Sequence, residues 1–437
     1  MIHTTRSSGK SAGRFVRPAL LCAAFAITPL GLSAPVAAQP IAQPVAQAPG
    51  LGGTLFLRPD RGAAASELMR LLATAQADGL DPRRYRLRDL QRLTRDARNG
   101  DPRAVMRADR ALSETYTRYV TDLRRAPNVG VIYVDNELRP QAPGPAELLR
   151  AAATAPDLAA HLRDMGFMHP YYAQLRRQLT DNRLDARTQG LVRLNMDRVR
   201  SLPAGGRYVL VNSAAQRLFM MEGNQAVDMM RVVVGKPVHP TPMMAALIRY
   251  TSLRPYWNVP SDLAAERIAP NVVKGGMPYL RAKGYQVLSD WSDRAKLVNP
   301  AGVDWTAVAA GRKEVRLRQL PGPANSMGDM KFMFPNVQGI YLHDSPQDEL
   351  FGEAARLFSG GCVRLEAADR LATWLYGKPL KAKGAAPEQK VTMARPVPVY
   401  LTYLTAVPSG NSLAFYEDIY RKDVAPATRP GRRLAGL

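Results

Sequence analysis

The spacing of apolar side chains in the first half of the chain predicts helices. From about residue 64 to residue 202, apolar residues recur at intervals of three and four, as on one face of a helix. The pattern is clearest in ASELMRLLATAQADGL, AVMRADRALSETYTRYVTDLRRA, PAELLRAAATAPDLAAHLRDMG and DNRLDARTQGLVRLNMDRVRSL. It stops at SLPAGG, because proline and paired glycines end helices. We therefore predict an N-terminal helical domain over residues 51–203.

The pattern changes at Arg207, where β-branched and apolar residues begin to alternate with polar ones. The run RYVLVNSAAQRLFMMEGNQAVDMMRVVVGK contains Gly223-Asn224 between two alternating halves, which is a hairpin turn signal. Residues 339–344 and 390–407 also have strand character. In the second of these, Pro396 and Pro398 indicate an edge strand or a bend.

A second, mostly β domain is therefore expected over residues 204–423, with one clear helix at 366–377. A segment rich in proline, glycine and tryptophan, residues 252–336, interrupts it. Segments of this length inside a β domain often form a lid or a binding wall, so a capping insertion is expected. The predicted fold class is α+β.

The N-terminus has the pattern of a secretory signal peptide. An apolar run at 19–32, too short to span a bilayer, precedes small residues and a cleavage pattern at Val36-Ala37-Ala38. Basic residues lie before the run: Arg6, Lys10, Arg14 and Arg17. We predict a signal peptide over 1–38 and a Pro/Ala/Gln linker over 39–50. Cys22 would be removed with the peptide, because Leu21 before it is not the small residue of a lipoprotein site.

The charge is strongly basic, with 60 Lys and Arg against 37 Asp and Glu in 437 residues, a formal net charge of +23. Such an excess is typical of chains that bind nucleic acid, anionic membranes or acidic polymers, and also of a merely solvated basic surface. The sequence contains no C2H2 spacing, no aromatic RNA-binding motif and no long lysine block, so nucleic acid is not an expected partner. An anionic envelope surface stays a candidate partner. We also predict a basic tail over residues 424–437.

Cys362 would be the single thiol of the exported chain. Such a thiol is buried and inert, paired between chains, or reactive. Attack on a carbonyl requires the thiolate, and an imidazole can take the thiol proton and stabilise the sulfur anion. His343 would serve if a strand carrying it lay beside the returning chain at Cys362.

The residues around Cys362 favour chemistry without deciding it. Ser359, Gly360 and Gly361 precede the thiol, and glycines let backbone N–H groups turn toward a reacting carbonyl. The charge of Arg364 could favour the thiolate or fix the loop through a carboxylate. The competing interpretation is a glycine turn before a helix, with a packed cysteine.

The other histidines offer little. His239 is a weak alternative base in a turn, and His3, His161 and His169 are isolated, with no metal-ligand spacing.

His343, followed after residues 344–358 by Ser-Gly-Gly-Cys-Val-Arg, resembles the signature of the YkuD-type L,D-transpeptidases. The usual motif is Ser, then His or Ser, then Gly-Cys-apolar-Arg or Asn, so Gly360 departs at the variable second place. Further segments resemble the larger YcbB-like branch with its N-terminal scaffold domain: LVRLNMDRVRSLP, VVVGKPVHPTPMM, PYWNVPSDLA, PGPANSMGDMKFMFPN and AFYEDIYRKD. The resemblance covers residues 51–423. Many members insert a peptidoglycan-binding module before RLNMDR, which is missing here.

The resemblance implies a β-sandwich-like catalytic domain that needs no metal or cofactor. Cys362 would be the nucleophile and His343 the general base and acid, oriented by a backbone carbonyl rather than by the Asp344 side chain. Backbone N–H groups of Gly361 and Cys362 would hold the oxyanion. Ser359, Gly360 and Arg364 would support the loop, and Tyr341, Trp257 and Asn325 would contact substrate.

The resemblance also implies the reaction, in the periplasm of a Gram-negative envelope. The thiolate would attack the third residue of a peptidoglycan tetrapeptide stem, usually meso-diaminopimelate, and release D-Ala. An amine of a neighbouring stem would resolve the thioester as a 3→3 cross-link, in cell-wall organisation and cell shape. Carbapenems would acylate the same cysteine.

Rival functions stay open. Water as acceptor would make a carboxypeptidase or endopeptidase, and a protein amine an anchoring transferase. A non-enzymatic peptidoglycan-binding scaffold is the alternative of a different class. Papain-like and sortase-like peptidases fit less well, because papain-like chains place the cysteine before the histidine and sortases lack the segments quoted above.

Overall fold

The computed structural model describes residues 53–423 except residues 182 and 293. The predicted signal peptide (1–38), linker (39–50) and basic tail (424–437) lie outside the described residues. Within the described part of the chain, no helix is both long and apolar enough to cross a membrane.

The predicted helical pattern is confirmed. The helices are α1 (Ala64–Ala73), α2 (Leu87–Asp96), α3 (Pro102–Arg124), α4 (Pro145–Thr154), α5 (Leu158–Arg163), α6 (Pro170–Thr180) and α7 (Ala186–Val199). Side chains cap the N-termini of four of them by accepting first-turn N–H groups: Asp101 for α3, Asp157 for α5, His169 for α6 and Asp185 for α7.

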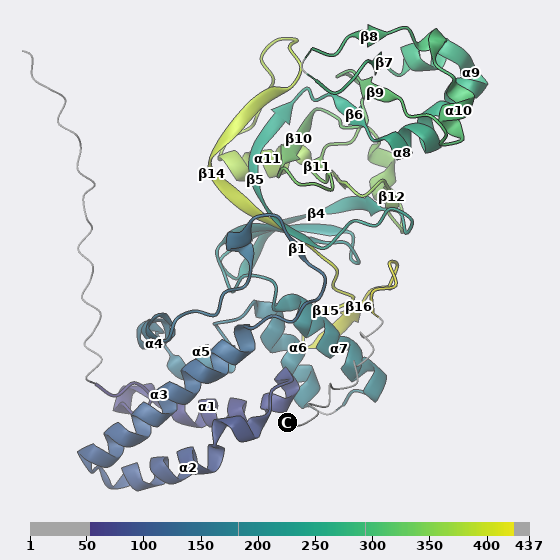
Figure 1. Ribbon diagram of the computed structural model, residues 1–437. Helices are drawn as coiled ribbons and strands as arrows, with labels where there is room; N and C mark the ends of the chain where they lie inside the picture. The colour runs from purple at the N-terminus through teal and green to yellow at the C-terminus, as the bar shows by residue number, and fades with distance from the viewer. Residues whose placement is uncertain (1–52, 182, 293, 424–437) are drawn as a thin grey trace, which may run out of the picture. The chain divides into compact units, whose positions relative to one another are not determined.

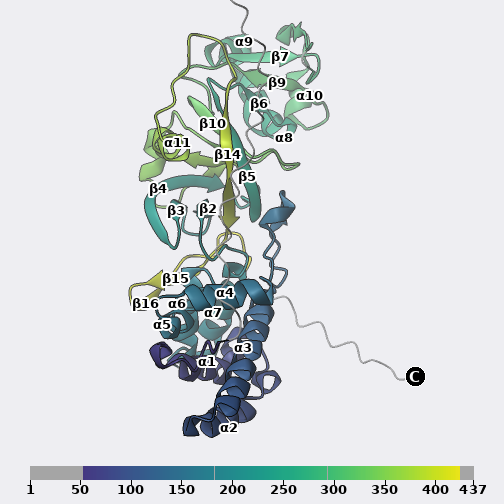
Figure 2. The same cartoon turned by 90° about the vertical axis from the view of Figure 1, so that its left-hand side faces the viewer.

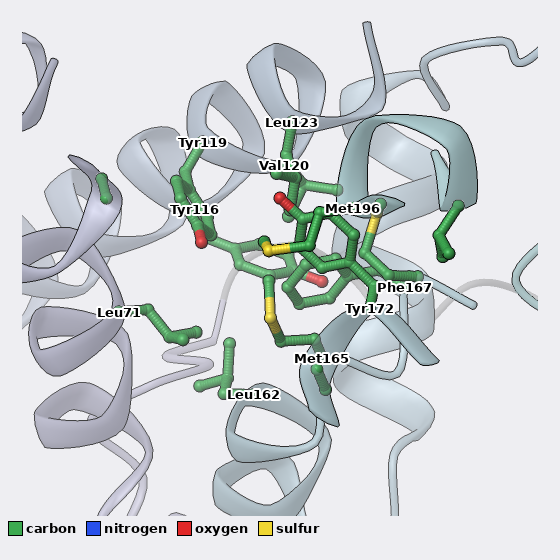
Figure 3. Close-up of a cluster of buried hydrophobic side chains, with 14 of the residues drawn as sticks. Leu71, Tyr116, Tyr119, Val120, Leu123, Leu162, Met165, Phe167, Tyr172 and Met196 are labelled. Carbon is green, nitrogen blue, oxygen red and sulfur yellow. The ribbon is translucent and has the colours of Figure 1, made fainter. Parts of the chain in front are cut away.

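The helical core is built around the inner face of α3. Its buried residues recur at helical spacing, so they form one stripe: Leu112, Tyr116, Tyr119, Val120 and Leu123. Phe167 meets the rings of Tyr116 and Tyr119 edge-on, at centroid distances of 6.0 and 6.5 Å, and Figure 3 shows these side chains in one cluster.

A buried carboxylate ties this core together. The Asp78 side chain accepts hydrogen bonds from Tyr119 (2.9 Å), Tyr172 (3.1 Å) and the Arg176 guanidinium (2.8 Å). Arg176 and Asp78 are both buried, so each charge depends on the other for compensation.

The main sheet closes on itself. In the described residues its order is β1 (Ile132–Tyr133), β5 (Met244–Leu253), β10 (Met330–Met333), β11 (Leu342–His343), β13 (Val363–Leu365), β4 (Gln225–Gly235), β3 (Arg217–Glu222), β2 (Arg207–Asn212) and β14 (Gln389–Thr402), with β12 (Leu357–Ser359) paired to β4. β5 also pairs with β14, and Figure 1 shows these strands side by side. The α+β prediction is confirmed, and the expected sandwich-like domain is a closed sheet.

Several local predictions are confirmed. β3 ends at Glu222 and β4 begins at Gln225, so Gly223-Asn224 is a two-residue hairpin turn, with Gly223 at φ 60°. The helix predicted at 366–377 is α11 (Ala368–Tyr376).

One prediction needs correction, because the strand expected over 339–344 contains only β11, residues 342–343. The edge and the bend expected at Pro396 and Pro398 are both confirmed. Here β14 pairs with β5 alone, and its pairing with β2 begins at Val399. The register shift between Thr392 and Val397 is the bend.

Two segments contact a different domain from the one that the sequence pattern predicts for them. β1, inside the predicted helical range, runs parallel to β5 at Met244 and Ala245. The hairpin β15 (Ala406–Ser409) and β16 (Ser412–Phe415) packs against α6 and α7, as Figure 2 shows for α6.

The insertion between β5 and β10 folds as a unit with its own core. Because β5 runs to residue 253 and β10 begins at residue 330, it spans 254–329, inside the predicted 252–336. Its sheet has the order β6 (Trp257–Val259), β9 (Arg316–Gln319), β7 (Tyr285–Leu288) and β8 (Leu297–Val298). Its helices are α8 (Ser261–Leu263), a π-helical turn at Ala264–Ile268, α9 (Ala269–Ala282) and α10 (Trp305–Ala309).

Replacement of Asp78 by alanine tests the buried carboxylate. The change leaves the Arg176 guanidinium buried without its counter-charge, so we expect the free energy of unfolding to fall by about 3–5 kcal/mol. Denaturant titration followed by circular dichroism measures it. The matched control is Asp164→Ala, which removes an exposed pair with Arg177 and should cost less than about 1 kcal/mol. Equal losses in both variants would contradict the assignment.

Candidate active site

The pairing of β11 with β13 brings the two predicted catalytic residues to one face of the sheet. The strands are parallel, and Leu342 pairs with Val363 while His343 pairs with Arg364. Side chains alternate along a strand, and paired residues share a face. Leu342 and Val363 are fully buried in the sheet core. The opposite face therefore carries His343 and Arg364. It also carries Tyr341 and Cys362, each two residues earlier in the chain.

His343 is held as a neutral base. Its Nδ1 lies 2.6 Å from the backbone carbonyl oxygen of Asp344, which can only accept, so Nδ1 carries the proton and Nε2 the lone pair. The prediction of an orienting backbone carbonyl is confirmed, since the Asp344 carboxylate instead accepts the Asp329 N–H at 2.8 Å. Burial and, next, the positive charge of Arg364 lower the pKa of His343 to about 3.

Cys362 is a protonated thiol at neutral pH. Burial raises its pKa to about 11, although hydrogen bonding from the Tyr341 backbone and the charge of Arg364 act in the opposite direction. The sulfur donates to the carbonyl oxygen of Gly339 at 3.6 Å, and the side chain keeps part of its surface exposed. The resting pair is therefore thiol and neutral imidazole, which requires proton transfer during attack.

Ser359 holds the loop that carries the thiol through two hydrogen bonds. Its Oγ donates to the carbonyl oxygen of Cys362 at 2.6 Å and accepts the N–H of Gly361 at 3.1 Å. Thr241 Oγ1 donates to the carbonyl oxygen of Gly361 at 2.8 Å. Gly361 has φ +115°, a conformation that favours glycine.

The hydrogen bond between Gly361 and Ser359 affects the expected oxyanion donors. The N–H of Gly361, predicted to hold an oxyanion, donates to Ser359 Oγ. The N–H of Cys362 makes no hydrogen bond within the described residues, so it can donate to an oxyanion without breaking an existing bond. An oxyanion role for Gly361 would require the bond to Ser359 to break.

Two family models match the chain. Residues 206–399 match the L,D-transpeptidase catalytic domain named YkuD, and residues 55–179 match the Scaffold domain. The chain therefore carries a YkuD L,D-transpeptidase catalytic domain preceded by a Scaffold domain. A Haemophilus influenzae protein named "Putative L,D-transpeptidase" is 30% identical over 237 residues. The alignment covers 53% of this chain and 47% of that protein, so the chain spans about half the length of its curated relative.

The insertion within this YkuD domain fills the space next to Gly360. A Cβ built on Gly360 would lie 2.8 Å from Cδ1 and 3.1 Å from Cδ2 of Leu263, which ends α8. The variable second position of the motif is therefore covered by a side chain from another part of the chain. Sequence analysis missed Leu263, and no local signal in the sequence marks it.

Polar contacts also tie the insertion to the catalytic domain. Arg267 Nη2 donates to the carbonyl oxygen of Phe358, the residue before Ser359, at 3.0 Å. His239, the weak alternative base, has its Nε2 3.1 Å from the Glu266 carboxylate. His239 thus contacts the insertion in this structure.

The predicted substrate contacts have different surroundings. Tyr341 packs against the insertion core, and its ring lies edge-on to His343 with centroids 5.8 Å apart. Trp257 is buried in that core. Asn325 is fully buried, and its amide bonds to the backbone of Pro255, Leu320 and Met327. The expectation for Asn325 is therefore corrected: its polar atoms hold the insertion loop together and are not available to substrate.

Within the described residues, no cluster of His, Cys, Asp and Glu is arranged to hold a metal ion.

The pH dependence of thiol alkylation tests the resting protonation state. Because the pKa of Cys362 is raised to about 11, the thiolate fraction should increase about tenfold per pH unit between pH 7 and pH 10. The rate of modification by iodoacetamide, followed by intact mass where circular dichroism is unchanged, should rise in parallel. A plateau from neutral pH upward would instead indicate a preformed thiolate–imidazolium pair.

Gly360→Ala tests the packing of Leu263. The added methyl group must displace a packed side chain, so we expect a loss of about 1–3 kcal/mol in unfolding free energy and slower acylation of Cys362. Adding Leu263→Ala in the same chain makes room and should recover part of both. Gly302→Ala, with nothing within 4 Å of its Cβ, is the control. Strictly additive losses in the double variant would argue against direct contact.

Proposed function

We propose that the chain is a peptidoglycan L,D-transpeptidase with Cys362 as nucleophile. The observation that carries the proposal is the β11–β13 register, which gives a neutral, oriented His343 and Cys362 a shared face. A signature match alone would not supply this geometry. The family match supports the reaction class, and the predicted signal peptide supports a periplasmic location with stem peptides as substrates.

Acylation begins with the thiol proton. As Sγ attacks the carbonyl carbon of the third stem residue, Nε2 of His343 takes the proton, and the charge of Arg364 stabilises the developing thiolate. The N–H of Cys362 donates to the carbonyl oxygen as it becomes an oxyanion. The C–N bond then breaks, the imidazolium returns its proton to the nitrogen of the departing D-Ala, and a thioester remains.

Transfer reverses these roles. The amine of an acceptor stem attacks the thioester carbon and gives a proton to His343, and Sγ leaves and recovers a proton from the imidazolium. The product is a 3→3 cross-link. The low pKa of His343 favours return of the proton at each step, so the imidazolium is a transient species. Water or a protein amine could resolve the same thioester, which gives the carboxypeptidase, endopeptidase and anchoring alternatives.

Intact mass after incubation with a carbapenem tests the nucleophile. We expect one covalent adduct on the chain starting at Gln39, because Cys362 is its only cysteine, and no adduct on Cys362→Ala. His343→Ala should acylate about 100-fold or more slowly, the range for loss of a general base. Tetrapeptide stems then identify the acceptor through their products: dimer for transpeptidation, tripeptide for hydrolysis. A folded protein that forms no adduct would favour the scaffold alternative.

A further inference from the structure

Two guanidinium groups lie next to the nucleophile loop without an acidic partner. Arg364 is the cross-strand partner of His343, and Arg267 reaches from the insertion to the carbonyl oxygen of Phe358. Among the residues that the structure describes, no ion pair joins either of them to a carboxylate. Like charges at this place repel each other, so the arrangement is costly unless an anion joins it.

Arg364 is deeply buried and has an unused donor. The residue is only 8% exposed. Its Nη1 donates to Gln347 Oε1 at 2.8 Å, and its Nε has no hydrogen-bond partner among the described residues. A buried charged donor left unpaired is destabilising. Burial and, next, the nearby charge of Arg267 lower the pKa of Arg364 to about 10, which agrees with an uncompensated site.

Other buried arginines among the described residues are satisfied within the fold. Arg176 pairs with Asp78 at 2.8 Å, and Arg198 pairs with Asp423 at 2.7 Å. Arg356, 8% exposed like Arg364, has no carboxylate, but its guanidinium donates to three backbone carbonyl oxygens. Arg364 has neither kind of partner and bonds only to the amide oxygen of Gln347, which indicates a place for a carboxylate from outside the chain.

We propose that Arg364 and Arg267 form a subsite that binds a carboxylate of the donor peptide next to Cys362. A guanidinium offers N–H groups in a planar fork that matches a carboxylate, and two of them can hold one anion from two directions. Arg267 comes from the insertion, so the insertion contributes directly to substrate choice.

The inference rests on the proposed function for the identity of the donor. A tetrapeptide stem has one carboxylate at the end of its leaving residue and another on the side chain of a meso-diaminopimelate third residue. Both lie within one residue of the scissile carbonyl. A bound carboxylate would also offset the charge of Arg364, which opposes protonation of His343, so the base would accept the thiol proton more readily once the donor is in place.

Binding to Cys362→Ala protein, which cannot react, tests the subsite by calorimetry. The ligands are the tetrapeptide stem, its C-terminal amide and its third-residue side-chain amide. We expect the free stem to bind about 10-fold or more tightly than one of the amides, as for loss of a charge-assisted hydrogen bond, and the weaker amide identifies the carboxylate. Adding Arg267→Gln should remove most of this difference, and Arg267→Lys should restore part of it.

Arg281→Gln is the matched control, because it removes an exposed arginine of α9 in the same insertion and should leave the preference intact. Melting temperatures establish that each variant is folded. Equal affinity for the three ligands, no binding of the free stem, or a preference unchanged by Arg267→Gln would overturn the subsite. Thioester formation on Cys362 is measured separately: a preference without any thioester would refute the proposed function alone, and a thioester without a preference would refute the subsite alone.

Discussion

The parallel pairing of β11 with β13 is the constraint on which the site depends. β11 is only two residues long, yet its register with β13 decides which side chains share a face. A slip of one residue would move His343 into the core and turn Leu342 toward the insertion. The closed sheet protects this register, because β11 is held between β10 and β13 with no free edge.

Burial, rather than a preformed ion pair, determines the resting chemistry. It raises the pKa of Cys362 and lowers that of His343, so both groups are neutral. Arg364 adds an asymmetry: its charge favours a thiolate and disfavours an imidazolium. In the proposed reaction, charge develops only during attack, where the guanidinium of Arg364 and the N–H of Cys362 can stabilise it. A thiol is also less prone to oxidation than a thiolate.

The insertion takes part in this arrangement. Leu263 occupies the space beside Gly360, and Arg267 holds the carbonyl of Phe358, so the nucleophile loop is contacted from a separate core. Any movement of the insertion would change the packing and the charge at the thiol together. Asn325, by contrast, keeps the shape of the insertion itself, with its amide bonded to the backbone.

The sequence by itself determined the local structure and the chemical groups. Periodicity located the helices, and glycine and asparagine located the hairpin at 223–224. The spacing of His343 and the motif at Cys362 indicated the resemblance to YkuD-type L,D-transpeptidases. Each of these signals can be seen in the sequence without knowledge of the tertiary structure. Only the tertiary structure decided that β1 joins the sheet, that β14 gains β2 as a second neighbour after Pro398, that Asn325 bonds to the backbone, and that Leu263 and Arg267 contact the loop before Cys362. These features are contacts between segments far apart in the chain, where packing and burial, not local pattern, choose the partner.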